Sequence, residues 1–185
     1  MNFTTNTPEH NGQPPLIHVS GSHREMGHQI GEACREQVQR SVHNGKELIG
    51  STTELLELDW VGAHIQARKY LPFAQERYPQ YVDELNGIAE GANVPFDDLV
   101  VLNAMEAVTS DALHLSKCTS MAVSNDLTAD GHVLVAHNED WLPEDEDDVY
   151  LIHASPDNEP PFLAMAYGGL LPNIGFNAYG IAQGC

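Results

Sequence analysis

The segment from residue 118 onward contains the side chains best suited to covalent chemistry. Small and apolar residues alternate over 118–123 and again over 133–137, with a glycine-containing connection between them. This alternation predicts a β-hairpin, because successive side chains on a strand point to opposite faces. Taking residues 127–131 as a five-residue loop fixes the pairing of the two strands.

That pairing decides which reactive groups lie together. It places Cys118 opposite Asp140 and Ser120 opposite Asn138, so a thiol, a carboxylate, a hydroxyl and a carboxamide share one face of the hairpin. His137 could act as a base for a thiol, but this register points it to the opposite face. We therefore expect His137 to have a structural role.

The charge of the chain restricts its partners. With 27 acidic and 8 basic residues, the formal net charge is −19. Nucleic acids and anionic membrane surfaces would be repelled, so neither is expected as a partner. Neutral or cationic small molecules are compatible with this charge. At 185 residues, of which 42% are hydrophobic, the chain can bury one sizeable core.

Cysteine and histidine usage argues against a bound metal and against a disulfide framework. The three cysteines, Cys34, Cys118 and Cys185, are few and far apart, and the ten histidines show no metal-ligand spacing. We expect no metal and no organic cofactor. The N-terminus lacks an apolar signal segment, and no apolar run has the length of a membrane span, so a cytoplasmic location is expected.

The first part of the chain has helical periodicity. Residues 1–15 are polar and predict a disordered lead-in, and Leu16–Ser20 predicts a short strand. A Ser-x-x-Glu capping box precedes a helix over about 24–43, whose apolar stripe includes Cys34 as a buried side chain. Three or four further helices are expected over 51–111.

The second part changes character and predicts strands. Short alternating or apolar runs are separated by Gly, Pro and Asn turns, as in an antiparallel sheet. The predicted fold class is therefore α+β, with an N-terminal helical segment followed by an antiparallel β-sheet. The acidic run 144–148 is expected to be a solvated loop rather than a calcium site. The runs that predict strands are 118–123, 133–137, 149–153, 162–167, 174–176 and 181–185.

Five short segments together carry a family signal. They are 21–31 (GSHREMGHQIG), 85–92 (LNGIAEGA), 118–120 (CTS), 138–141 (NEDW) and 174–180 (IGFNAYG). Each alone is a weak signal, whereas five in this order are specific. The set resembles the isopenicillin N acyltransferase family of N-terminal nucleophile hydrolases. The resemblance implies an αββα sandwich, of which this chain would form an incomplete part.

The resemblance further implies a precursor that cuts itself between Lys117 and Cys118. Residues 16–117 would form a mainly helical pro-segment or small subunit, and residues 118–185 the start of a β-rich catalytic subunit. Cys118 would be the nucleophile and its new α-amine the general base. Such an amine has a pKa of about 7.8, near neutrality, so no histidine is required.

The same resemblance assigns partners to the nucleophile. Asp140 would hydrogen-bond the new ammonium group, and Asn177 would help to hold the oxyanion. Related amidases often carry Arg where this chain has His137, and the penicillin-forming member of the family has an aromatic residue in place of Glu139. The resemblance therefore does not identify the substrate. The implied reaction is hydrolysis or acyl transfer at a linear C–N amide bond through a Cys118 thioester. Its substrate would be a small-molecule amide or an acyl donor such as acyl-CoA.

Family members continue beyond the point where this chain stops. We therefore expect a catalytic subunit truncated at residue 185, whose incomplete sheet favours self-association. Two other hypotheses stay open. The chain could be a non-catalytic acidic α+β module or an inactive fragment in which Cys118 is structural. A papain-like protease is a weaker alternative, because the residues after Cys118 lack a His and an Asn at the required spacing.

Overall fold

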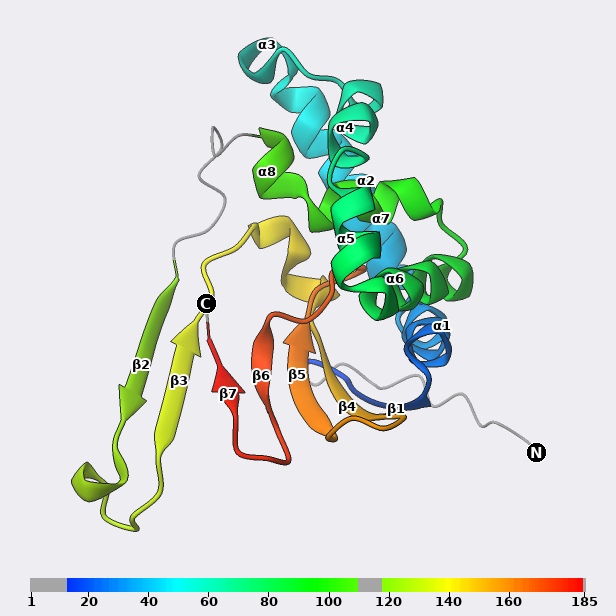
Figure 1. Cartoon of the computed structure of the whole chain (residues 1–185). Coiled ribbons are helices and arrows are strands. Elements are labelled where there is room, and N and C mark those ends of the chain that lie inside the picture. Colours follow the sequence, from blue (N-terminus) through cyan, green and yellow to red (C-terminus); the bar gives the residue numbers. More distant parts are fainter. Residues whose placement is uncertain (1–12, 110–117, 185) are drawn as a thin grey trace.

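The computed structural model describes residues 13–109 and 118–184, and its helices and strands occupy separate parts of the molecule (Figure 1). The fold is α+β, as the sequence predicts. None of the described helices has the length and apolar content that a membrane span requires. The elements are, in order, β1 (Leu16–Gly21), α1 (His23–Ala33), α2 (Arg35–Ser51), α3 (Thr53–Leu56), α4 (Trp60–Ala67), α5 (Leu71–Arg77), α6 (Pro79–Ala92), α7 (Phe96–Asn103), α8 (Met105–Thr109), β2 (Thr119–Val123), η1 (Asn125–Leu127), β3 (Leu134–Asn138), η2 (Pro143–Asp148), β4 (Tyr150–Pro156), β5 (Phe162–Ala166), β6 (Ile174–Asn177) and β7 (Ala182–Gln183).

The strands form two sheets. One has the order β1-β4-β5-β6-β7, and the other is the β2-β3 hairpin. β1 runs parallel to β4, with Leu16 beside Leu151, while the other neighbours in the large sheet are antiparallel. The prediction of a purely antiparallel sheet was therefore wrong for β1. A parallel pair needs a long crossover connection, and the helical segment between β1 and β4 provides one.

The core lies between one face of the large sheet and the helices. Tyr150, Ile152 and Ala154 of β4 are buried, whereas His153 between them is exposed. This alternation is typical of a sheet that is covered on one face. The buried side includes Met26 of α1, which belongs to the same hydrophobic cluster.

α1 and α2 meet at Cys34, so the single helix predicted over 24–43 is in fact two helices. Cys34 has φ −112° and ψ 28°, which end α1 and start α2. Its side chain is buried, as predicted, and burial raises the pKa of its thiol to about 12. Cys34 is therefore an inert core side chain at neutral pH. The periodicity hid the break because Cys34 continues the apolar stripe.

α1 and α6 pack closely because glycines replace side chains where the two helices touch. Gly27 and Gly31 of α1 lie against Gly87 and Gly91 of α6, and the two helices lie side by side in Figure 1. A Cβ on Gly87 would lie 2.3 Å from the carbonyl oxygen of Arg24, and Cβ atoms on the other three would meet carbonyl oxygens at 2.0–2.3 Å. Helix packing thus accounts for four of the five glycines in two of the family-like segments, all except Gly21.

The acidic segment 144–148 is not the solvated loop that was predicted. It forms most of η2, in which Asp145 and Asp148 are buried. The side-chain amide of Asn44 donates to Asp145 (2.8 Å), and Nε of Arg40 donates to Asp148 (2.8 Å). Both donors belong to α2, so this helix holds the segment that follows β3.

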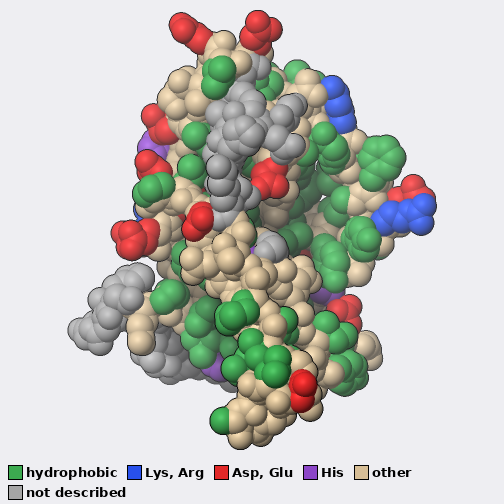
Figure 2. Space-filling model, turned by 90° about the vertical axis from the view of Figure 1, so that its left-hand side faces the viewer, with side chains coloured by type: hydrophobic (Ala, Val, Ile, Leu, Met, Phe, Trp, Pro, Cys, Tyr) green, Lys and Arg blue, Asp and Glu red, His purple; other side chains and the backbone are tan. Residues whose placement is uncertain are grey.

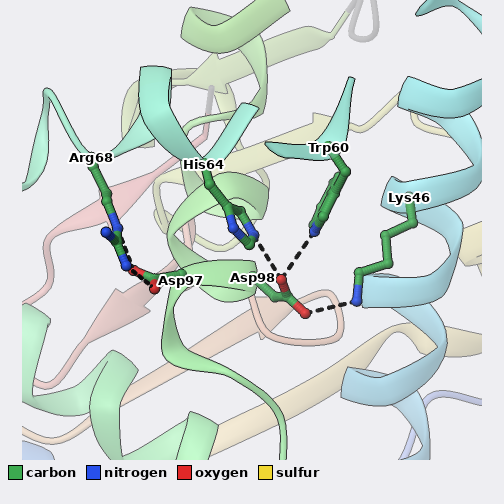
Figure 3. Close-up of polar contacts among 6 residues, drawn as sticks. All are labelled: Lys46, Trp60, His64, Arg68, Asp97 and Asp98. Atoms are coloured by element: carbon green, nitrogen blue, oxygen red, sulfur yellow. Dashed lines mark hydrogen bonds and ion pairs between the residues drawn. The ribbon is translucent and has the colours of Figure 1, made fainter. Parts of the chain in front are cut away.

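A third buried carboxylate, Asp98 of α7, is 2% exposed and joins three helices. It accepts hydrogen bonds from Nζ of Lys46 (2.8 Å) and Nε1 of Trp60 (3.0 Å), and a ring nitrogen of His64 lies 2.8 Å away (Figure 3). Burial by itself raises the pKa of Asp98, but these hydrogen bonds and the charge of Lys46 outweigh it and hold the pKa below its ordinary value.

The face of the large sheet that points away from the helices carries exposed apolar side chains. Leu16 and Phe176 are 50% and 56% exposed. His18 and His153 lie on the same face, with their Nδ1 atoms 3.0 Å apart. The predicted self-association through the sheet stays a prediction.

The glycine contact between α1 and α6 predicts a large effect of a small substitution. Gly87→Ala places a methyl group against backbone atoms that cannot rotate away, so we expect it to destabilise the chain by about 3 kcal/mol. Gly50→Ala in α2 is the matched control, because nothing lies within 4 Å of its added Cβ. It should stabilise by about 0.5 kcal/mol through helix propensity. Urea denaturation measures both, and equal effects would contradict the packing account.

The Asp98 cluster predicts a pH-dependent contribution to stability. Asp98→Asn weakens the hydrogen bonds from charged and polar donors, so we expect a loss of about 2 kcal/mol at pH 7. Because the folded-state pKa of Asp98 is lowered, its contribution is present above the pKa of the unfolded chain and disappears as the pH falls through the folded pKa. The difference between wild type and variant should therefore shrink below about pH 4.

The neighbouring residue provides the control for this prediction. Asp97 pairs with Arg68 at the surface, where the two side chains are 30% and 62% exposed. Asp97→Asn should cost less than about 1 kcal/mol, because water and salt screen an exposed pair. Denaturation curves between pH 3 and about pH 8 compare the two variants. A cost for Asp97→Asn as large as that for Asp98→Asn would show that burial is not the cause.

Candidate active site

The register of the β2-β3 hairpin differs by one residue from the prediction. Ser120 pairs with His137, and Val123 pairs with Leu134. The connection is therefore residues 124–133 rather than 127–131, and it contains η1, whose hydrogen bonds interrupt the strand pairing. Because side chains alternate between the two faces of a strand, a one-residue shift changes which side chains of β2 share a face with a given side chain of β3.

The shift changes the neighbours of the thiol. His137 lies on the same face as Ser120, so the prediction that it points away from Cys118 was wrong. One ring nitrogen of His137, one carboxylate oxygen of Glu139 and Sγ of Cys118 all lie within 4.8 Å of one another. Asp140, predicted to lie opposite Cys118, does not belong to this group and is exposed.

A hydrogen-bond chain fixes the imidazole. Oγ of Ser120 lies 2.8 Å from Nδ1 of His137, and Nε2 of His137 lies 2.7 Å from Oε2 of Glu139. The side chains of His137 and Glu139 are only 5% and 10% exposed, which strengthens the interaction between them. Cys118 beside them is half-buried. A hydroxyl, an imidazole and a carboxylate in series can hold or transfer a proton next to a thiol.

Residues from three other parts of the chain lie near this group. Tyr167 is 8% exposed; burial raises the pKa of its hydroxyl, and the nearby charges of Glu139 and Cys118 raise it further. The ring of Trp141 lies 5.5 Å from that of Tyr167. On another side, a Cβ built on Gly184 would lie 3.2 Å from Oγ of Ser120, so the backbone at the end of β7 packs against the hydrogen-bond chain.

Two curated proteins match most of this chain. The β-alanyl-dopamine/carcinine hydrolase of Drosophila melanogaster is 25% identical over 175 residues, which cover 85% of this chain and 44% of the relative. The acyl-coenzyme A:6-aminopenicillanic-acid acyltransferase 40 kDa form of Emericella nidulans is 22% identical over 170 residues, which cover 90% of this chain and 46% of the relative. The chain is distantly related to a hydrolase and an acyltransferase.

These relationships have clear bounds. No family model matches the chain. The chain spans less than half of the length of either relative. The likeness agrees in kind with the resemblance that the five sequence segments indicate.

The remaining predicted site residues lie elsewhere or outside the described chain. The side-chain oxygen of Asn177 accepts hydrogen bonds from the backbone N–H groups of Tyr179 (3.0 Å) and Ile181 (3.1 Å), so it closes the turn between β6 and β7. That turn and the start of β2 lie at opposite ends of the strands in Figure 1. Lys117, on one side of the predicted cleavage bond, belongs to residues 110–117, outside the described residues.

Sequence reasoning missed Glu139 and assigned His137 to the wrong face, although a signal for both was present. The two residues are separated by one position, and a strand places such residues on the same face. Whether that face is also the face of Cys118 depends on the register, which an irregular connection such as η1 makes hard to predict. The spacing of His137 and Glu139 could have identified them as a pair. Their position beside the thiol could not have been predicted, because it depends on the register.

A hollow that contains none of these residues lies between α6 and α7. Its lining includes Asn86, Glu90, Asn93 and Phe96. None of the residues that line it is a cysteine, serine or histidine, so it offers no nucleophile or imidazole base. The group around Cys118 is therefore the stronger candidate for covalent chemistry.

Proposed function

We propose that the chain belongs to a cysteine-dependent amide hydrolase or acyltransferase in which Cys118 is the nucleophile. The observation that carries this proposal is the position of the Cys118 thiol beside the hydrogen-bonded pair of His137 and Glu139. The two distant relatives, a hydrolase and an acyltransferase, support the reaction class. We also propose that the complete protein has the αββα sandwich fold of N-terminal nucleophile hydrolases.

The reaction proceeds in two halves. The thiol of Cys118 loses its proton to a base, and the thiolate attacks the carbonyl carbon of a linear amide to give a tetrahedral oxyanion. The oxyanion collapses, the C–N bond breaks, and the amine leaves with the proton. Water or a second amine then attacks the Cys118 thioester and returns the thiol. Whether water or an amine wins depends on how well the complete site excludes water.

The base differs before and after the proposed self-cleavage. In the uncut chain the nitrogen of Cys118 forms an amide bond with Lys117 and cannot accept a proton. The imidazole of His137, oriented by Glu139, is the base beside the thiol at that stage. After the cut, the new α-amine of Cys118 can take over as the base, and Asp140 would assist as the partner of the ammonium group.

The charge around the nucleophile favours one type of substrate. The segment from Cys118 to Cys185 contains eleven Asp and Glu residues and no Lys or Arg. In Figure 2, which views the hairpin side, the lower part of the molecule shows hydrophobic side chains and no blue ones. An acyl-CoA carries phosphates, which the acidic segment 118–185 would repel, whereas a β-alanyl amide carries a free ammonium group at neutral pH. We propose neutral or cationic amides as substrates.

Self-cleavage tests the nucleophile. We expect the purified 185-residue chain to separate into two fragments that meet between Lys117 and Cys118, as measured by intact mass under denaturing conditions. Cys118→Ala should abolish the cut, because no other thiol occupies that position. His137→Asn should slow it by about a hundredfold, the size of a typical general-base contribution.

Two controls accompany the cleavage experiment. His132→Asn changes an exposed histidine in the connection of the same hairpin, and Cys34→Ala removes the buried thiol. Both variants should cut at the wild-type rate once their folding has been checked by circular dichroism. A single uncut mass for the wild type at every time point would contradict self-cleavage and favour the non-catalytic module.

Substrate charge provides a separate prediction. Release of free amine from carcinine or β-alanyl-dopamine should exceed acyl transfer from an acyl-CoA to 6-aminopenicillanic acid by about tenfold or more in kcat/KM, because the acidic surface attracts cations. Raising the salt from about 0.05 to about 0.5 M should reduce this preference through screening. Chromatography of the products measures both reactions, with Cys118→Ala as the blank. Faster turnover of the acyl-CoA would contradict the electrostatic argument.

A further inference from the structure

The side chains around Cys118 have the types and positions of metal ligands as well as of catalytic groups. Thiolate sulfur, imidazole nitrogen and carboxylate oxygen are the donors that Zn²⁺ takes in proteins. Here Sγ of Cys118, a ring nitrogen of His137 and a carboxylate oxygen of Glu139 lie within 4.8 Å of one another. In a tetrahedral zinc site such atoms are about 3.3–3.6 Å apart, so small side-chain rotations would suffice.

The hydrogen bonds already present prepare the imidazole for a metal. Nε2 of His137 faces Glu139 at 2.7 Å, and Nδ1 faces Oγ of Ser120 at 2.8 Å. An ion between Nε2 and Glu139 would replace the proton shared there, and the distance between the two atoms would open to about 3.3 Å. The imidazole proton would then sit on Nδ1 and be donated to Ser120. A second hydrogen bond of this kind is the usual support for a histidine that binds a metal.

Charge balance also suits a divalent ion in this place. Binding releases the Cys118 proton to solvent, so the thiolate and the Glu139 carboxylate together supply two negative charges. With neutral His137, the complex with a divalent cation has no net charge, which lowers the cost of placing it among largely buried side chains. Three protein ligands leave a fourth position for water.

We propose that Cys118, His137 and Glu139 form a binding site for a zinc-type divalent ion, and that the bound ion blocks the Cys118 thiol. A thiolate that donates a lone pair to the metal has less electron density for attack on a substrate carbonyl, and the ion also occupies space beside the sulfur. The ion would thus act as a reversible inhibitor of the nucleophile. Metal binding needs no catalysis, so the site and the proposed function can be tested apart.

Cobalt provides a direct probe of the sulfur ligand. Titration of the reduced 185-residue chain with Co²⁺ should produce the near-ultraviolet thiolate-to-metal charge-transfer band. Cys118→Ala should abolish the band, whereas Cys185→Ser should keep it. The exposed pair His18 and His153 offers two nitrogens and no sulfur, so binding there would give no such band.

Matched variants test the other two ligands. His137→Asn and Glu139→Gln should each weaken Co²⁺ binding by at least about tenfold. His132→Asn and Glu146→Gln, which change exposed residues of the same types within ten positions of His137 and Glu139 in the sequence, should leave it unchanged. Circular dichroism shows whether each variant is folded. If a variant does not fold, the test rests on alkylation of the wild-type thiol.

Protection of the wild-type thiol needs no variant. Zn²⁺ should slow alkylation of Cys118 by about tenfold or more, as measured by peptide mass mapping, and EDTA should restore the rate. Absence of the charge-transfer band, its survival in Cys118→Ala, or alkylation that ignores Zn²⁺ would overturn the site. If Zn²⁺ protects Cys118 and Co²⁺ gives the band but the chain does not cut itself, the metal site is supported and the proposed function is not. If the chain cuts itself but shows neither protection nor the band, the proposed function is supported and the metal site is not.

Discussion

The close contact between α1 and α6 is the constraint on which the rest of the structure depends. Four glycines bring the two backbones to a separation that any side chain would prevent. His23 of α1 adds a 2.5 Å hydrogen bond to the buried carboxylate of Glu84 in α6. β1 ends directly before α1 and pairs in parallel with β4, so this helix contact also fixes where the sheet begins. This contact is therefore one of the places where the helical layer is joined to the sheet.

The helical layer reaches the candidate site through α2. Its residues Arg40 and Asn44 hold Asp148 and Asp145 of η2, and η2 follows the strand that carries His137. Nε1 of Trp141 also donates to Asp145 (2.8 Å), so the chain just beyond Glu139 is tied to the same buried acid. The buried acids of η2 therefore have a structural task. They hold the return segment whose side chains approach the thiol, because each is paired with a donor from another element.

Local patterns predicted the parts of this fold that depend on local interactions. The α+β class, the capping box of α1, the burial of Cys34 and the positions of the strands all follow from periodicity and end signals. The break at Cys34 escaped prediction because a small apolar residue satisfies both helices. The burial of Asp145 and Asp148 depends on donors about 100 residues earlier in the chain, which an acidic run does not reveal. The parallel partner of β1 is still farther away in sequence, because Leu16 pairs with Leu151.

The candidate site shows how strongly chemistry can depend on strand register. In the predicted register the thiol would face Asp140, an acid that can only accept a proton or orient an amine. In the observed one its neighbours are His137 and Glu139, which form a base with a fixed orientation. An imidazole lone pair and a carboxylate that draw a proton from a thiol also attract a soft divalent cation, because both processes stabilise the thiolate. The proposed activation of Cys118 and its proposed sensitivity to metal ions therefore rest on the same arrangement, and a substitution of His137 or Glu139 should weaken both.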